Sequence, residues 1–158
     1  MTQSLDPTRI QLVPHASPYP KVSHTAPPSR ATRETILVIE DDADVRELVQ
    51  KLLEFLGYHT LMAENGTVGL ALYREHQKKV LVVLTDMKMP AMQGAEVIQT
   101  LRTINPEVRI VVMSGVPEEM ARVVEEPGRL AFLQKPMTKK DVVRAFQFVL
   151  KNPTAAPL

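Results

Sequence analysis

Residues 80–86 read VLVVLTD, an unbroken apolar run that ends in a threonine and an aspartate. Runs that are apolar at successive positions are typical of strands covered on both faces, as in a parallel sheet. A second apolar run, ILVI at residues 36–39, ends in the same way at Glu40 and Asp41. Because the carboxyl ends of parallel strands meet at one edge of a sheet, we expect Glu40, Asp41 and Asp86 to lie close together.

Short β-branched runs alternate with amphipathic stretches on both sides of these segments, which predicts an α/β domain with a parallel sheet over residues 34–152. The expected strands are residues 35–39, 60–63, 80–84, 109–113 and 130–133. The first helix is expected to begin near Asp44, whose side chain can cap it, and to end at Gly57. Its apolar residues recur at helical spacing, which predicts burial of Val45, Leu48, Val49, Leu52 and Leu56.

Three further helices are expected after Asn65, after Gly94 and after the Lys135–Pro136 pair. A fourth, acidic helix at residues 118–124 carries few apolar residues that could attach it to the domain. We therefore expect it to be the least stable helix.

Two more of the expected strands also end at polar residues. Ser114 follows RIVVM and Lys135 follows AFLQ. Carboxylates crowded at one sheet edge repel each other, and a divalent cation among them relieves that repulsion. A hydroxyl and an ammonium can hold phosphoryl oxygens opposite such a cation. The sequence therefore predicts a Mg²⁺ site beside a phosphate-binding pair.

These motifs resemble those of the CheY-like receiver domains of two-component response regulators, both single-domain regulators and the receiver domains of hybrid kinases. The resemblance rests on four segments in the family's order: ILVIEDDADVREL at 36–48, LTDMKMPAMQG at 84–94, VVMSG at 111–115 and FLQKP at 132–136. It implies a flavodoxin-like (βα)5 fold, in which a doubly wound five-stranded parallel sheet has the strand order 2-1-3-4-5.

The resemblance also implies a role for each acid at the sheet edge. Asp86 is then the phosphoacceptor, although an aspartate at a strand end taken alone is equally well a helix or turn cap. Asp41 and Asp86 are expected to bind Mg²⁺ directly, and Glu40 through a water molecule. In the family a backbone carbonyl two residues after the acceptor completes the protein ligands, which here is that of Lys88.

Ser114 and Lys135 are expected to bind the phosphoryl oxygens, and the family holds the bond before Pro136 in the cis form. Phe132 occupies the family's switch-aromatic position, where a tyrosine is more common; a core phenylalanine is the alternative. In the family the hydroxyl moves toward the phosphoryl group and the aromatic ring turns inward, which changes the surface of the fourth helix, fifth strand and fifth helix. Lys88 also occupies one of the positions that modulate loss of phosphate by water.

Composition limits the remaining function classes. The chain has 158 residues, 44% of them apolar, with no cysteine, no apolar run long enough for a membrane span and no apolar signal segment. We expect a cytoplasmic protein without membrane attachment. Residues 34–152 are mildly acidic, which disfavours nucleic-acid binding. Residues 1–33 hold six of the thirteen prolines and are expected to form a disordered tail, and residues 153–158 a frayed end.

The function expected from these features is phosphorelay signalling. A histidine kinase or histidine phosphotransfer protein would phosphorylate Asp86, and the changed surface would bind a downstream protein. No effector segment follows the last helix, so the output is expected to be protein binding or onward phosphotransfer. Such a receiver is not a turnover enzyme, although it can lose its own phosphoryl group.

Two alternatives are a phosphorylation-independent interaction module and a Mg²⁺-dependent aspartyl phosphatase. The phosphatase family needs its nucleophile on the first strand and a second aspartate two residues later, where this chain has Lys88.

Overall fold

The computed structural model describes residues 34–120 and 125–151. The two expected tails, residues 1–33 and 153–158, lie outside the described residues, as do residues 121–124 of the expected fourth helix.

The described strands form one five-stranded sheet in which every neighbouring pair is parallel. Its order is β2-β1-β3-β4-β5, which confirms the predicted topology. The strands are β1 (Thr35–Ile39), β2 (His59–Ala63), β3 (Val80–Asp86), β4 (Ile110–Ser114) and β5 (Leu130–Gln134). The apolar run at residues 80–86 is thus the central strand, and Asp86 is its last residue.

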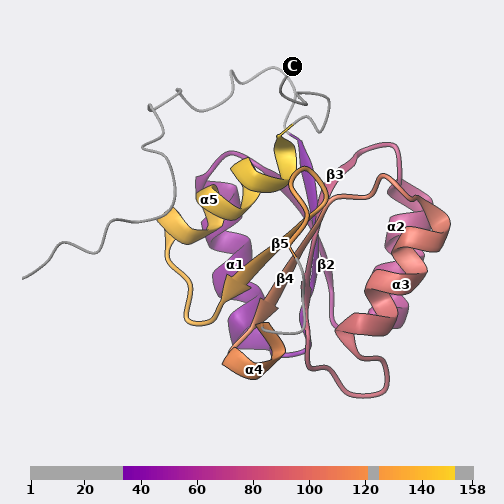
Figure 1. Ribbon diagram of the computed structural model, residues 1–158, viewed down its shortest axis with the longest axis horizontal. Helices are drawn as coiled ribbons and strands as arrows, with labels where there is room; N and C mark the ends of the chain where they lie inside the picture. Colours follow the sequence, from indigo (N-terminus) through magenta and orange to yellow (C-terminus); the bar gives the residue numbers. More distant parts are fainter. Residues whose placement is uncertain (1–33, 121–124, 152–158) are drawn as a thin grey trace, which may run out of the picture.

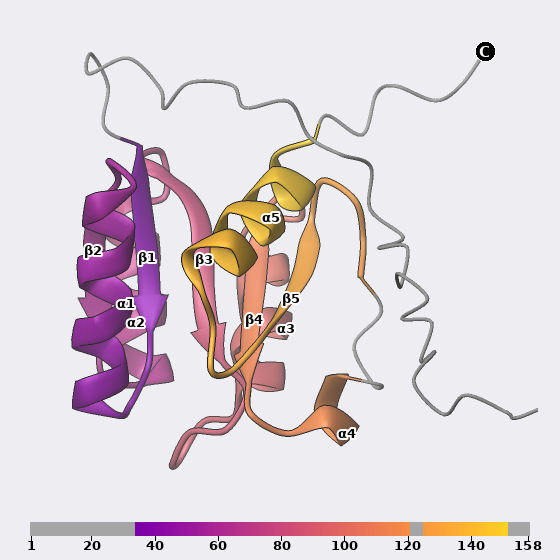
Figure 2. The same ribbon diagram turned by 90° about the vertical axis from the view of Figure 1, so that its left-hand side faces the viewer.

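Helices cover both faces of this sheet. They are α1 (Ala43–Phe55), α2 (Gly66–His76), α3 (Gly94–Ile104), α4 (Pro117–Met120) and α5 (Lys139–Leu150). Figure 1 shows α1 and α5 on one side of the sheet and α2 and α3 on the other. In Figure 2, turned by 90°, α4 lies beyond the end of β4, at the edge toward which the strands run.

The alternation of side chains along the strands divides the core into two layers. In β1, Ile36 and Val38 pack with the buried residues of α1 and α5, while Leu37 and Ile39 pack with those of α2 and α3. All four side chains are fully buried. A strand with both faces covered requires a continuous apolar sequence, which is why β1 and β3 read as unbroken runs.

Two details of α1 differ from the prediction. Its N-cap is Asp42, whose Oδ1 accepts the backbone N–H groups of Asp44 and Val45, so the helix begins earlier than expected. Leu48, expected to be buried, is 62% exposed. Residues of an α-helix follow one another at about 100° around the axis, so Leu48 lies beside the stripe centred on Val49 rather than within it. The end at Gly57 is confirmed: this residue has a φ of 93°, which suits glycine.

The fourth helix begins one residue before the predicted start, at Pro117, a residue type favoured at the first helical position. Its described part ends at Met120.

A capping box begins α5. The Thr138 Oγ1 accepts the N–H of Asp141, and the Asp141 Oδ2 accepts the N–H of Thr138 at 2.8 Å. The hydrogen bonds from the Thr138 side chain and backbone hold the pKa of Asp141 below its usual value. The ionised carboxylate therefore stabilises the folded state.

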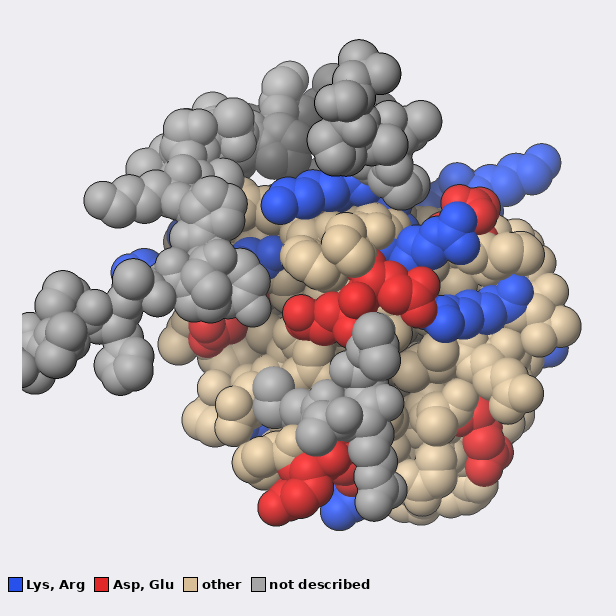
Figure 3. Space-filling model, viewed as in Figure 1, with Lys and Arg blue, Asp and Glu red and all other residues tan. Residues whose placement is uncertain are grey.

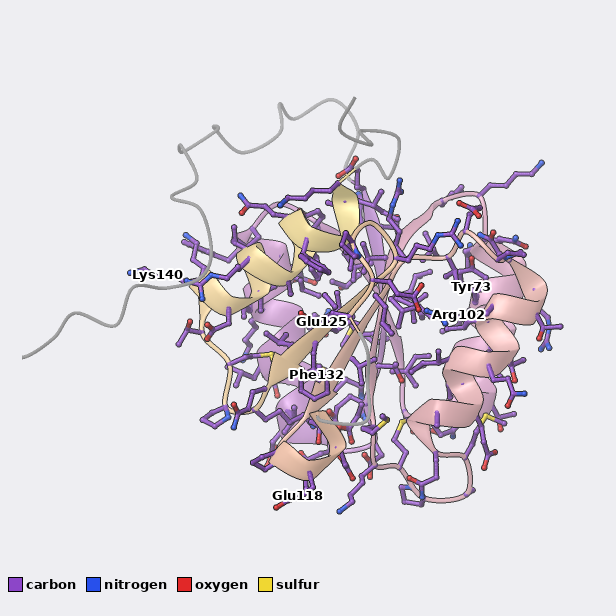
Figure 4. All side chains as sticks on the ribbon, viewed as in Figure 1. Tyr73, Arg102, Glu118, Glu125, Phe132 and Lys140 are labelled. Carbon is purple, nitrogen blue, oxygen red and sulfur yellow. The ribbon has the colours of Figure 1, made fainter. Side chains whose placement is uncertain are left out.

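Thr138→Ala and Asp141→Ala are each expected to lower the free energy of unfolding by about 1 kcal/mol at pH 7, measured by urea denaturation. The Asp141 contribution is present above the ordinary carboxyl pKa of about 4 and is lost as pH falls through the lowered folded value. The difference between wild type and Asp141→Ala should therefore shrink below about pH 4. Lys140, exposed on the same turn (Figure 4), is the control: Lys140→Ala should change stability by less than about 0.5 kcal/mol.

Candidate functional site

Three carboxylates meet at the carboxyl edge of the sheet. One oxygen from each of Glu40, Asp41 and Asp86 lies within 4.8 Å of the others. Glu40 directly follows β1, and Asp86 ends the neighbouring strand β3. Glu40 is 1% exposed and Asp86 6%, whereas Asp41 faces solvent. The sheet therefore brings together the three acids predicted from sequence, two of them buried and one accessible.

Lys135 supplies a positive charge to both buried acids. Its Nζ lies 2.6 Å from Glu40 Oε2 and 3.0 Å from Asp86 Oδ1. The backbone N–H of Lys135 donates to the Ser114 carbonyl oxygen at 2.8 Å, which joins the end of β5 to that of β4. The peptide bond between Lys135 and Pro136 is cis, the isomer expected from the resemblance. One ammonium is thus shared by two carboxylates.

Burial sets the ionisation tendency of these groups. It raises the pKa of Glu40 and of Asp86 above the ordinary carboxyl values, against the opposing effect of the Lys135 hydrogen bonds. Burial alone would lower the pKa of Lys135, but its hydrogen bonds to the two acids outweigh it and raise the pKa. Three acids near one ammonium leave an excess of negative charge. Hard carboxylate oxygens in this arrangement fit a divalent cation such as Mg²⁺.

Arg46 fixes the backbone that carries two of these acids. Its Nη1 donates to the carbonyl oxygens of Glu40 at 2.7 Å and Asp41 at 3.2 Å. The second Glu40 oxygen accepts the N–H of Asp42 at 3.1 Å. One carboxylate oxygen of Glu40 therefore accepts a backbone N–H and the other contacts Lys135. These contacts orient the side chains of both Glu40 and Lys135.

Ser114 lies at the same edge, but its hydroxyl is engaged by α4. The Ser114 Oγ donates to Glu119 Oε2 at 2.5 Å and accepts the N–H of Val116 at 3.0 Å. Another Glu119 oxygen lies 3.5 Å from the Nζ of Lys88. Acidic and basic side chains also meet along the lower edge of the molecule in Figure 3, where α4 lies in the same view of Figure 1. The structure therefore joins Ser114 and Lys88 through a residue that the sequence analysis did not single out.

The loop after Asp86 is tightly packed. The Gly94 N–H donates to the Met87 carbonyl oxygen at 2.9 Å, and a Cβ on Gly94 would lie 2.4 Å from the Asp86 carbonyl oxygen. Ala91 has a φ of 65°, which is unusual for a residue other than glycine. By contrast, a Cβ on Gly115 would meet nothing nearer than the Lys135 Cβ at 4.0 Å. The site is therefore confined on the Gly94 side and open on the Gly115 side.

Phe132 is half-buried and packs against the core layer beneath α2 and α3. Its backbone N–H, on the edge strand β5, donates to Glu125 Oε1 at 3.0 Å. Figure 4 shows both residues on one face of the molecule, with Phe132 between Glu125 and α4 in this view.

The sequence matches the family described as "Response regulator receiver domain" over residues 36–147, which contain every site residue described above. The chain belongs to this family. Receiver domains take part in two-component signalling and bind Mg²⁺ at an acidic pocket, and this receiver has an acidic cluster formed by Glu40, Asp41 and Asp86.

Two curated relatives illustrate the range of proteins that contain this domain. The sporulation initiation phosphotransferase F of Bacillus subtilis is 31% identical over 104 residues, which are 65% of this chain and 82% of that protein. The sensor kinase CckA of Brucella abortus is 29% identical over 119 residues, 75% of this chain but 13% of the kinase. The receiver also spans about half the length of several transcriptional regulators.

A solved structure supports the same assignment. The response regulator receiver domain protein from Clostridium thermocellum is 29% identical and superimposes with a TM-score of 0.65, covering 73% of this chain and 93% of that chain. None of the helices in the described ranges of this receiver has the length and apolar character needed to cross a bilayer.

Sequence reasoning missed two residues of this site. Arg46 acts on backbone carbonyls, and no side-chain pattern indicates such a contact. Glu119 reaches Ser114 because of the turn between β4 and α4, which no motif in the sequence marks. The acids and Lys135 were detectable because each follows an apolar run.

Gly94→Ala is expected to destabilise the receiver by about 1–3 kcal/mol in urea denaturation, because the added methyl group meets the Asp86 backbone and not a flexible side chain. Gly115→Ala is the matched control, since its methyl group makes only ordinary contact. Equal stability of the two variants would contradict the close packing described for the Asp86 loop.

Proposed function

We propose that this receiver accepts a phosphoryl group on Asp86 from a phosphohistidine in the presence of Mg²⁺, and that phosphorylation alters a protein-binding surface. The observation that carries the proposal is the placement of Asp86. Its carboxylate ends the central strand, is buried, lies within 4.8 Å of two other carboxylates and contacts Lys135 at 3.0 Å. A helix or turn cap, the other role for an aspartate at a strand end, does not require that cluster.

The proposed step moves one phosphoryl group. A carboxylate oxygen of Asp86 attacks the phosphorus atom and forms a P–O bond while the P–N bond to the donor histidine breaks. The imidazole nitrogen keeps the electron pair of that bond and takes a proton from solvent. The product is an acyl phosphate on Asp86 and a free histidine, and catalysis of such a step depends mainly on positioning and neutralisation of charge.

The proposed Mg²⁺ ligands are Asp41 and Asp86, with Glu40 acting through a water molecule and Lys88 through its backbone carbonyl. A bound Mg²⁺ supplies positive charge near the phosphoryl oxygens. Burial of Glu40 and its bonds to Lys135 and to the Asp42 N–H suit an indirect role. The exposure of Asp41 suits a ligand that a cation reaches from solvent.

Lys135 and Ser114 are the proposed phosphoryl-binding side chains. Lys135 already contacts the acceptor carboxylate, and its raised pKa keeps it charged at neutral pH. Movement of Ser114 toward the phosphoryl group would leave space that the Phe132 ring fills, which would alter the face formed by α4, β5 and α5. We propose this face as the site for a downstream protein.

The proposed phosphodonor is a histidine kinase or a histidine phosphotransfer protein. One relative is named as a phosphotransferase and another as a sensor kinase, which supports transfer of phosphoryl groups between proteins. A receiver used only as an interaction module is the competing hypothesis, and the next experiment separates the two.

Incubation with acetyl phosphate and Mg²⁺ is expected to increase the intact mass of the wild-type receiver by one phosphoryl group. The increase should be absent without Mg²⁺ and absent in Asp86→Asn, because that variant lacks the nucleophilic oxygen. A second arm with a phosphorylated histidine phosphotransfer protein covers a receiver that does not react with small donors. Failure of the wild type with both donors would favour the interaction module.

Lys88→Asn is expected to change the lifetime of the acyl phosphate, because it removes an exposed cation two residues from the acceptor and its 3.5 Å ion pair with Glu119. The measurement is the decay of phosphorylated protein after removal of the donor, with Lys78→Asn as a control for loss of an exposed lysine away from the site. Identical decays for Lys88→Asn and the wild type would sink this hypothesis.

A further inference from the structure

Glu119 contacts two donor side chains beside the acid cluster, those of Ser114 and Lys88. Its carboxylate accepts the Ser114 hydroxyl at 2.5 Å and pairs with the Lys88 ammonium at 3.5 Å. The Glu119 side chain is 18% exposed, so it is held against the domain and does not project freely into solvent. The carboxylate of Glu119, on α4, therefore lies against the Ser114 hydroxyl.

While the Ser114 hydroxyl donates to Glu119, it cannot donate to another acceptor. A serine hydroxyl carries one hydrogen, so it donates one hydrogen bond at a time. The Val116 N–H already donates to the Ser114 oxygen, which leaves the hydroxyl hydrogen for Glu119. A phosphoryl group on Asp86 that accepts the Ser114 hydroxyl must first remove it from Glu119.

The charge of Glu119 acts in the same direction. A phosphoryl group carries about −1.5 to −2 charges at neutral pH. It would compete with the Glu119 carboxylate for Lys88 and would also repel it. The resulting separation would move α4, a helix of a single turn in its described part, which has little intrinsic stability to resist it.

We propose that Glu119 is an internal competitor of the phosphoryl group. It holds Ser114 and Lys88 in the unphosphorylated receiver, and phosphorylation displaces it together with α4. This inference rests on the proposed function of Asp86. It assigns to Glu119 a positioning role that acts through Ser114 and Lys88 and not through contact with the phosphorus.

Glu118 offers a matched control on the same turn of α4. It carries the same charge, is exposed, and projects away from the domain at the lower edge of Figure 4. A change caused simply by removing a negative charge near an anion site would therefore occur in Glu118→Gln as well as in Glu119→Gln.

The experiment measures binding of trifluoroberyllate, a phosphoryl mimic, in the presence of Mg²⁺ by isothermal titration calorimetry. Glu119→Ala is expected to bind it about three- to tenfold more tightly than the wild type, because no hydrogen bond or ion pair has to be broken first. Glu119→Gln should lie between the two, since its amide oxygen still accepts the Ser114 hydroxyl but no longer attracts Lys88. Glu118→Gln should bind like the wild type.

A second readout needs no ligand. The amide of Val116 donates to the Ser114 hydroxyl oxygen, so its ¹H–¹⁵N NMR signal reports the state of that hydroxyl. The signal should shift in free Glu119→Ala toward its position in the trifluoroberyllate complex of the wild type. The same spectra show whether each variant is folded, and Glu119→Gln provides the test if Glu119→Ala is not.

The outcomes separate the two proposals. Tighter binding by both Glu119 variants, with an unchanged Glu118→Gln, supports the role of Glu119. If the wild type binds trifluoroberyllate and the Glu119 variants bind it equally or more weakly, the role of Glu119 is overturned. The proposed function of Asp86 is then unaffected. Absence of Mg²⁺-dependent binding in every protein, the wild type included, overturns the proposed function and the Glu119 role with it.

Discussion

The shared ion pair of Lys135 with Glu40 and Asp86 allows carboxylates to be buried at the end of a parallel sheet. A buried carboxylate without a partner would be strongly destabilising, and here one ammonium contacts two of them. The pairing also connects β5 to β1 and β3 across the width of the sheet. The single Lys135 ammonium does not neutralise all three acids, and Asp41 remains exposed to solvent. The cluster therefore keeps a net negative charge, which favours binding of a divalent cation.

The sequence predicted the sheet and the acid cluster because both follow from the same apolar runs. A strand buried on both faces has to be continuously apolar, so β1 and β3 stand out, and their polar ends mark one edge. Ser114 and Lys135 were found by the same rule at β4 and β5. Residues that complete this edge could therefore be named from local sequence, together with the resemblance to receiver domains.

Contacts that depend on the exact path of the chain could not be predicted. Asp42 caps α1 although Asp44 is the same residue type two positions later, and the choice depends on where the backbone leaves β1. Leu48 is apolar but lies beside the packed stripe of its helix. Arg46 and Glu119 act across loops, on two backbone carbonyls and on a hydroxyl respectively, and none of these contacts leaves a periodic signal.

The hydrogen bond between the Phe132 N–H and Glu125 also affects how the molecule behaves among its neighbours. β5 is an edge strand, and an edge with open N–H groups is a template on which another chain can add a strand and start aggregation. Glu125 occupies one of those donors with a charged side chain. The segment just before β5 thus helps to keep a sheet of strongly apolar strands from joining the sheet of another copy.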